Sequence, residues 1–153
     1  KKVKTIVKNR QVLARRLSNN LKDLPGLKLP ICRNDYTHTY YCYAMQIDPN
    51  ILRNKRNIIF KKLIDFGVPV TKNYTNLHLL PMYQKKIAYG KKGFPWNKSI
   101  YNGKVSYKKG ICPIAEEINE KLFLGISMYN WEFNSQQIDI VADKFKKVWK
   151  SIL

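Results

Sequence analysis

The chain has 153 residues, enough for one domain with a substantial core, because a chain of this length buries roughly 70% of the surface that it exposes when unfolded. Hydrophobic residues make up 44% of it, yet no apolar run approaches the roughly 20 residues that a membrane-spanning helix needs, so the sequence predicts no membrane span. Lys and Arg outnumber Asp and Glu by 29 to 10, and the resulting net charge of +19 would suit binding to a polyanion.

The cysteines indicate the compartment of the protein, and the first residues indicate whether the chain is cut from a longer one. Cys32, Cys42 and Cys112 are widely spaced and form no C-x-x-C pair, so they predict reduced, structural thiols in a cytoplasmic protein rather than a disulfide framework or a metal site. The chain begins with Lys1, without a methionine or an apolar signal segment, and we expect it to be cut from a longer protein.

The first element is a long amphipathic helix. Apolar residues recur at helical spacing over residues 3–24, and Pro25 and Gly26 end the run. Residues 27–30 then predict a short extended link, because the residue before a proline disfavours helix.

A strand and a second helix follow. Residues 37–47 are rich in aromatic and β-branched side chains and predict a strand, with a structural histidine, His38, at its entrance. Asp48 marks a turn or a helix cap, residues 51–66 carry an apolar helical pattern, and Gly67 suits the left-handed position that ends helices.

The middle of the chain is less regular. Residues 68–70 predict the start of a strand that lies at an edge or is only partly paired, because Pro69 cannot donate to a ladder. Residues 85–109 predict a long loop insertion, in which glycines and prolines break the pattern while lysines keep it solvated. Within it, Trp96 either covers a pocket or pins the loop to the surface.

Three elements remain in the last part of the chain. Residues 112–120 predict a helix whose glutamates favour the helix dipole, and residues 122–128 predict a strand in which Gly125 marks a bulge or a close backbone approach. A terminal helix starts near Ser135, because Asn134 and the glutamine three residues later resemble a capping box. The order of elements predicts a single α+β domain over residues 1–153: a small antiparallel sheet of about three strands packed with helices.

Residues 73–83 are the candidate functional site. They gather a histidine, two tyrosines and two asparagines directly after a predicted strand, and we take Asn73, Tyr74, His78 and Tyr83 as candidate contacts. The alternative is a surface loop in which His78 caps a helix and the tyrosines fill gaps in the core. No P-loop, G-x-G-x-x-G, G-x-S-x-G or H-E-x-x-H motif occurs.

The order and spacing of several short motifs resemble the C-terminal small domain of the DegT/DnrJ/StrS family of pyridoxal-phosphate-dependent sugar aminotransferases, which are fold-type I enzymes. The matching positions cover nearly the whole chain: Arg10 and Ala14, Leu27 and Pro30, Arg56-Asn57, residues 67–70, residues 73–83, residues 113–116 and residues 134–137. Three departures bear on substrate identity: Asn73 replaces a histidine, Gly125-Ile126 replaces Leu-Pro, and the loop over residues 89–109 is longer than usual.

The resemblance implies that this chain is one half of an enzyme. The N-terminal domain that supplies the Schiff-base lysine and binds most of the pyridoxal phosphate is absent, so the fragment would hold no catalytic residue and no metal, and would be inactive alone. The residues implied to contact substrate or cofactor are His78, Tyr74, Asn73, Tyr83 and Trp96. The parent would be a homodimer that moves an amino group from an amino acid to a keto sugar nucleotide in the biosynthesis of amino sugars or surface polysaccharides. A family dehydratase would differ at the lysine that lies outside this chain.

A different class of function also fits the charge, namely an independent basic domain that binds nucleic acid or another polyanion. Only six of the 29 basic residues are arginine, the side chain that binds phosphates and bases bidentately, and the lysines are scattered over every segment. This pattern argues against nucleic-acid binding, and the length of the resemblance favours the aminotransferase domain.

Overall fold

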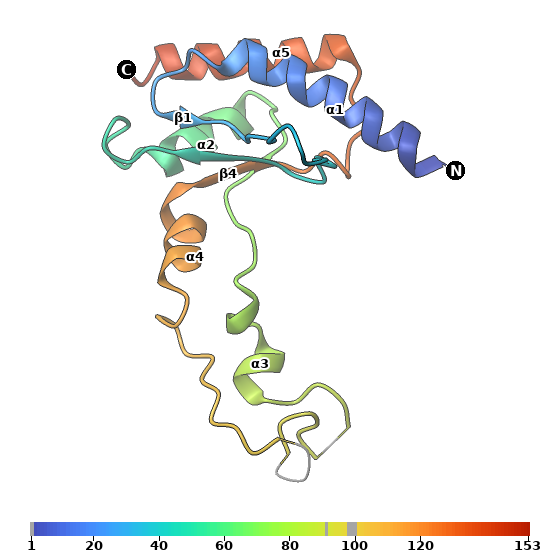
Figure 1. Cartoon of the computed structure of the whole chain (residues 1–153). Coiled ribbons are helices and arrows are strands. Elements are labelled where there is room, and N and C mark those ends of the chain that lie inside the picture. Colours follow the sequence, from blue (N-terminus) through green and yellow to red (C-terminus); the bar gives the residue numbers. More distant parts are fainter. Residues whose placement is uncertain (1, 91, 98–100) are drawn as a thin grey trace. The chain divides into compact units, whose positions relative to one another are not determined.

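The computed structural model describes residues 2–90, 92–97 and 101–153, so part of the expected loop over residues 85–109 lies outside the described residues. The chain divides into two compact units (Figure 1). The first unit comprises residues 1–73 with Lys121–Leu153, and the second comprises Tyr74–Glu120. Each is described by itself below.

The first unit contains a four-stranded antiparallel sheet. Its order is β1 (Leu27–Lys28), β2 (Tyr43–Ile47), β4 (Phe123–Ile126) and β3 (Val70–Thr71). The α+β class is therefore confirmed, with four strands where about three were expected. The additional strand is the predicted link over residues 27–30, whose first two residues pair with β2.

Strand β2 is shorter than the sequence predicted. The expectation of a strand from residue 37 was wrong, because Tyr40 adopts a positive φ of 47° that interrupts extended backbone. The backbone N–H of Tyr40 instead donates to Nδ1 of His38 over 2.8 Å. Strand β3 lies at the edge of the sheet, as Pro69 predicted.

Two long helices, α1 (Lys2–Leu21) and α5 (Ser135–Lys150), lie side by side over one face of the sheet (Figure 1). The predicted apolar stripe of α5 is buried, including Ile138 and Phe145. In α1 only the later part of the stripe is buried, since Val3 remains 65% exposed. The capping box of α5 is confirmed: the side chain and the backbone N–H of Asn134 both pair with the glutamine at position three of the helix.

Helix α2 (Arg56–Asp65) begins later than predicted. The expected start near residue 51 was wrong, because Arg53 and Asn54 have positive φ angles of 46° and 57° that are incompatible with a right-handed helix. Its end matches the prediction: Gly67 has φ 72° and donates to the carbonyl of Ile64, as in a Schellman motif.

Gly125 in β4 marks a close backbone approach, one of the two readings of its sequence position. A Cβ at this position would lie 2.5 Å from Cζ of Phe123 and 3.0 Å from Sγ of Cys42. The strand is not bulged, since Gly125 pairs in register with Ala44 on one side and Thr71 on the other.

The second unit consists of short helices and turns. In chain order they are η1 (Leu77–Leu79), α3 (Pro81–Lys85), α4 (Pro113–Glu117) and the π-helical turn η2 (Ile118–Leu122), which runs into the first unit. Between α3 and α4, the described residues contain only an isolated bridge between Tyr89 and Phe94.

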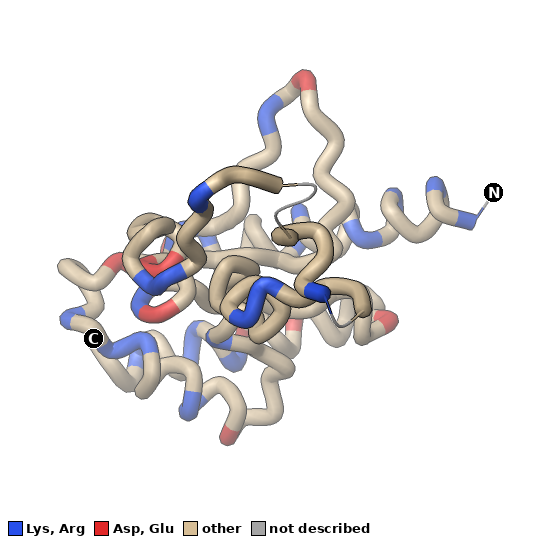
Figure 2. Tube along the Cα trace, turned by 90° about the horizontal axis from the view of Figure 1, so that it is seen from below, with Lys and Arg blue, Asp and Glu red and all other residues tan. Residues whose placement is uncertain are grey.

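The distribution of charge and thiols can also be followed along the chain. Figure 2 shows Lys and Arg spread over the described segments rather than gathered in one of them. Cys32, Cys42 and Cys112 are all free thiols. Among the described residues, no helix combines the length and the apolar character that crossing a bilayer would demand.

Candidate functional site

The second unit holds an enclosed pair of titratable side chains. Helix η1 carries His78 and the first turn of α4 carries Glu116, and Nε2 of the histidine lies 2.8 Å from Oε1 of the glutamate. Their side chains are only 10% and 7% exposed. The 38 residues between them in sequence make this a contact that the tertiary structure creates.

The backbone around Glu116 holds its carboxylate in the ionised form. Burial favours the neutral acid, but hydrogen bonds from the N–H of Gly110, from His78 and from the N–H of Cys112 together outweigh it and lower the pKa of Glu116 below its ordinary value. The N–H of Gly110 lies 2.8 Å from both carboxylate oxygens. Glu116 therefore accepts, and Nε2 of His78 donates.

This polarity fixes the orientation of His78. With Nε2 committed to Glu116, the ring presents its Nδ1 edge away from the pair, and Nδ1 makes no hydrogen bond to any described residue. A histidine oriented by a buried carboxylate can bind an anionic group or exchange a proton at its other nitrogen.

Helix α3 braces the backbone next to this pair. Nε2 of Gln84 donates to the carbonyl of His78 over 2.7 Å and to the carbonyl of Tyr107 over 2.5 Å. Lys86 similarly donates to the carbonyl of Val105 over 2.9 Å. The irregular segment around residues 105–107 is thus tied to α3, which keeps the turn carrying His78 in place.

Tyr83 and Trp96 come together in one aromatic cluster with Tyr107. The ring centroids of Tyr83 and Trp96 are 5.9 Å apart at 80°, and those of Tyr83 and Tyr107 are 5.1 Å apart. The indole Nε1–H of Trp96 donates to the hydroxyl of Tyr107 over 3.0 Å. Half-buried aromatic rings packed edge to face stabilise this part of the loop.

The two remaining predicted residues, Tyr74 and Asn73, are exposed. The side chain of Tyr74 is 56% exposed, while its backbone N–H donates to Oδ1 of Asn119 over 2.7 Å. Asn73 is the last residue of its segment in the first unit, where its carbonyl accepts from the hydroxyl of Thr71 over 3.2 Å.

Glu116 was not among the residues that we selected from the sequence. Its motif, residues 113–116, was part of the family resemblance, but we assigned its glutamates only a favourable interaction with the helix dipole. The structure adds His78 as a specific partner of Glu116. Such a partner is expected, because a glutamate that is only 5% exposed must be paired or hydrogen-bonded. No group of three or more potential metal ligands occurs among the described side chains.

The fold resembles part of a solved aminotransferase structure. The crystal structure of an aminotransferase TlmJ from Streptoalloteichus hindustanus superposes with a TM-score of 0.64, covering 98% of this chain and 33% of that chain at 19% sequence identity. At this identity the likeness concerns the fold alone. The first and second units together thus correspond to about a third of an aminotransferase chain.

Sequence comparison identifies the family. Residues 1–120 match the DegT/DnrJ/EryC1/StrS aminotransferase family, and the chain belongs to that family. Among its relatives, the spore coat polysaccharide biosynthesis protein SpsC of Bacillus subtilis is 25% identical over 107 residues, and an uncharacterized protein of Methanocaldococcus jannaschii is 26% identical over 106 residues. Each alignment covers 69% of this chain and 28% of the relative, so the chain spans less than a third of their length.

Proposed function

We propose that the chain is the C-terminal small domain of a pyridoxal-phosphate-dependent aminotransferase, which moves an amino group from an amino acid such as glutamate to the keto group of a sugar nucleotide. The observation that carries this proposal is the family match over residues 1–120. The name of SpsC, a spore coat polysaccharide biosynthesis protein, supports a role in the synthesis of surface polysaccharides or amino sugars.

The described lysines do not suit the cofactor. A lysine that forms a Schiff base with pyridoxal phosphate must lose its proton readily, and enclosure in an apolar pocket favours that loss. No lysine among the described residues is buried. We therefore propose that pyridoxal phosphate, which acts as an electron sink when bound, is held mainly by another domain of the parent enzyme, and that the parent is a cytoplasmic homodimer.

A spectrum tests this assignment on the isolated chain. We expect that adding pyridoxal phosphate to the 153-residue chain produces no stable Schiff-base band and no transaminase activity. A stable visible band that disappears on mutation of one particular lysine would contradict the proposal.

Within this function, His78 is the proposed contact to the substrate or to the phosphate of the cofactor. Its Nε2 is occupied by Glu116, so Nδ1 is the atom that would meet an anionic oxygen. We propose that Tyr74 lines the sugar pocket and that Asn73 donates a hydrogen bond in place of the family's usual histidine. Tyr83 contributes through the aromatic cluster that it forms with Trp96.

Kinetics of the full-length parent test the role of His78. His78→Ala should lower kcat/KM by about tenfold or more, because a charge-assisted contact contributes about 1.5 to 3 kcal/mol. Thr75→Ala, at an exposed neighbour in the same segment, is the matched control and should leave kcat/KM unchanged. Unchanged kinetics and unchanged stability in His78→Ala would rule out this role.

The loop over residues 85–109 is the proposed nucleotide contact. Its aromatic residues lie among lysines, and Trp96 or Tyr101 would stack on the base, an interaction worth roughly 1 to 3 kcal/mol. Deleting residues 96–103 in the full-length enzyme should raise KM for the sugar nucleotide while the dimer persists. Loss of the dimer without a specific effect on KM would instead support an insertion that stabilises the dimer.

A further inference from the structure

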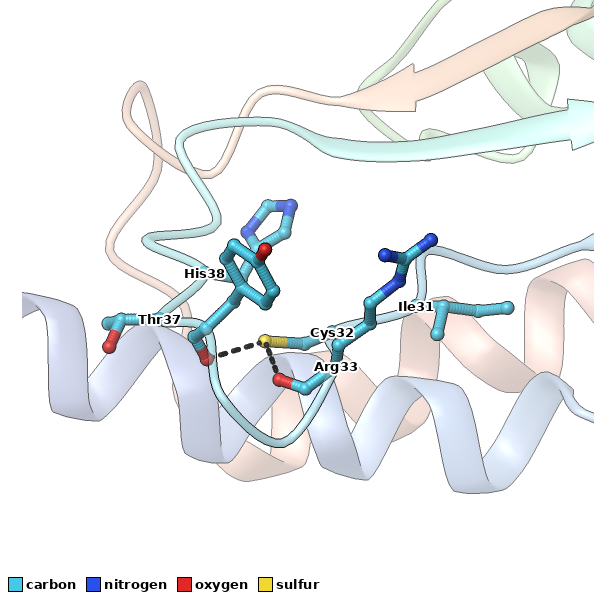
Figure 3. Close-up of a pocket in the computed structure, with 6 residues that line it drawn as sticks. Ile31, Cys32, Arg33, Thr37 and His38 are labelled. Atoms are coloured by element: carbon cyan, nitrogen blue, oxygen red, sulfur yellow. Dashed lines mark hydrogen bonds between the residues drawn. The ribbon is translucent and has the colours of Figure 1, made fainter.

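The first unit contains a pocket whose lining includes neither His78 nor Glu116. It lies between one face of helix α1 and the loop over residues 30–40. Figure 3 shows an adjoining pocket on the same loop, and three of its labelled residues, Cys32, Arg33 and His38, also line this pocket. The thiol of Cys32 lies 3.1 Å from the carbonyl of Tyr36, a contact that holds the loop in a tight turn.

Two guanidinium groups line the pocket without a partner. Arg15 comes from α1 and Arg33 from the loop, and neither guanidinium group makes a hydrogen bond or ion pair with a described residue. On the same helix, Arg16 behaves differently, because its Nε and Nη2 bind both carboxylate oxygens of Asp139 at 2.7 Å. No carboxylate is among the side chains that line the pocket.

The hydroxyl of Tyr40 is a further polar group of this pocket without a hydrogen-bond partner among the described residues. Tyr40 lines the pocket and is only 7% exposed, yet its hydroxyl has no hydrogen-bond partner among the described residues. No fully buried side-chain oxygen or nitrogen of the described chain is unpartnered, so this hydroxyl reaches the pocket space. It is therefore a largely desolvated donor that only a ligand or solvent in the pocket can satisfy.

His38 supplies another donor. Its Nδ1 accepts the backbone N–H of Tyr40 over 2.8 Å, so the neutral ring carries its proton on Nε2. The ring stacks on that of Tyr40 with centroids 4.1 Å apart, which fixes its plane. The remaining polar edge of His38 therefore donates as well.

We propose that this pocket binds the phosphate group of a small molecule. Arg15 and Arg33 supply two forks of N–H donors, Tyr40 and His38 supply neutral donors, and no side-chain carboxylate opposes an anion. A phosphate dianion has more acceptor oxygens and more charge than a carboxylate. It can therefore accept hydrogen bonds from donors on both α1 and the loop.

Calorimetry with inorganic phosphate tests the site on the full 153-residue chain, at an ionic strength held constant with sodium chloride. We expect saturable binding. Arg15→Gln and Arg33→Gln should each raise Kd by about tenfold, and Tyr40→Phe, which removes only the hydroxyl, by about threefold. Arg10→Gln on the same helix makes the same change of charge outside the pocket and should leave Kd within about twofold.

Three results would overturn the proposal. The first is the absence of saturable phosphate binding by the wild-type chain. The second is equal weakening by Arg10→Gln and by the pocket variants, because the phosphate would then respond only to the overall positive charge. The third is tighter binding of sodium glutamate than of phosphate, which would make the pocket a carboxylate site. Circular dichroism of each variant shows that the fold is retained.

Discussion

At the residue scale, the carboxylate of Glu116 links three backbone segments of the second unit. It accepts from His78 on η1, from Gly110 in the preceding loop and from Cys112 at the start of α4. Although burial opposes its ionisation, these hydrogen bonds lower its pKa below the ordinary value of 4.5. A lowered pKa in the folded state means that the ionised group stabilises the fold.

The sign of the pH dependence follows from this shift. The contribution of Glu116 is fully present above its unfolded pKa, and it is lost as the pH falls through the lower pKa of the folded state. We expect Glu116→Gln to reduce the hydrogen-exchange protection of the Gly110 and Cys112 amides near neutral pH, and the difference from wild type to vanish in acid. Glu132→Gln, at an exposed carboxylate, is the control. A difference that persists below the folded pKa would contradict the assignment.

Arg56 is a buried charged residue that donates hydrogen bonds to backbone carbonyls in the first unit. It is 6% exposed, and its Nη1 donates to the carbonyl of Lys72 over 2.6 Å and to that of Phe123 over 3.3 Å. Burial lowers the pKa of Arg56. The first residue of α2 is thus anchored to the strands that carry the chain toward and away from the second unit, which gives a structural reason for its place in the family pattern.

At the element scale, α5 depends on its first turn for a defined start. Asn134 and Gln137 satisfy each other's backbone N–H groups at 2.9 Å, and the helix packs on α1 through its buried stripe. Asn134→Ala should lower the free energy of unfolding by about 1 kcal/mol, as measured by urea denaturation. Gln136→Ala, in the same exposed turn, should change it little. Equal effects of the two substitutions would argue against the capping box.

At the scale of the whole molecule, the net charge of +19 opposes compaction. Screening of like charges should therefore stabilise the fold, and we expect the urea midpoint to rise when sodium chloride is increased from about 20 mM to about 200 mM. Exposed ion pairs such as Arg16–Asp139 would weaken with salt, but there are few acidic partners for the cations. A midpoint that falls with salt would show that ion pairs outweigh the repulsion.

Local signals in the sequence were sufficient for several elements. The capping box at Asn134, the Schellman glycine at Gly67 and the edge position signalled by Pro69 all match the structure. Each depends on residues only a few positions apart, so short-range geometry decides it. The family resemblance likewise followed from the order of short motifs.

The sequence alone determined the α+β class, the amphipathic helices and the stretch that carries His78. The structure decided where β2 begins, because Tyr40 has a positive φ and its N–H donates to Nδ1 of His38, which the periodicity of the sequence does not show. It also paired His78 with Glu116 and left Arg15 and Arg33 beside one pocket. The His78–Glu116 pair and the pocket with Arg15 and Arg33 bring together side chains that are distant in sequence, and only the closure of the intervening chain sets their separation.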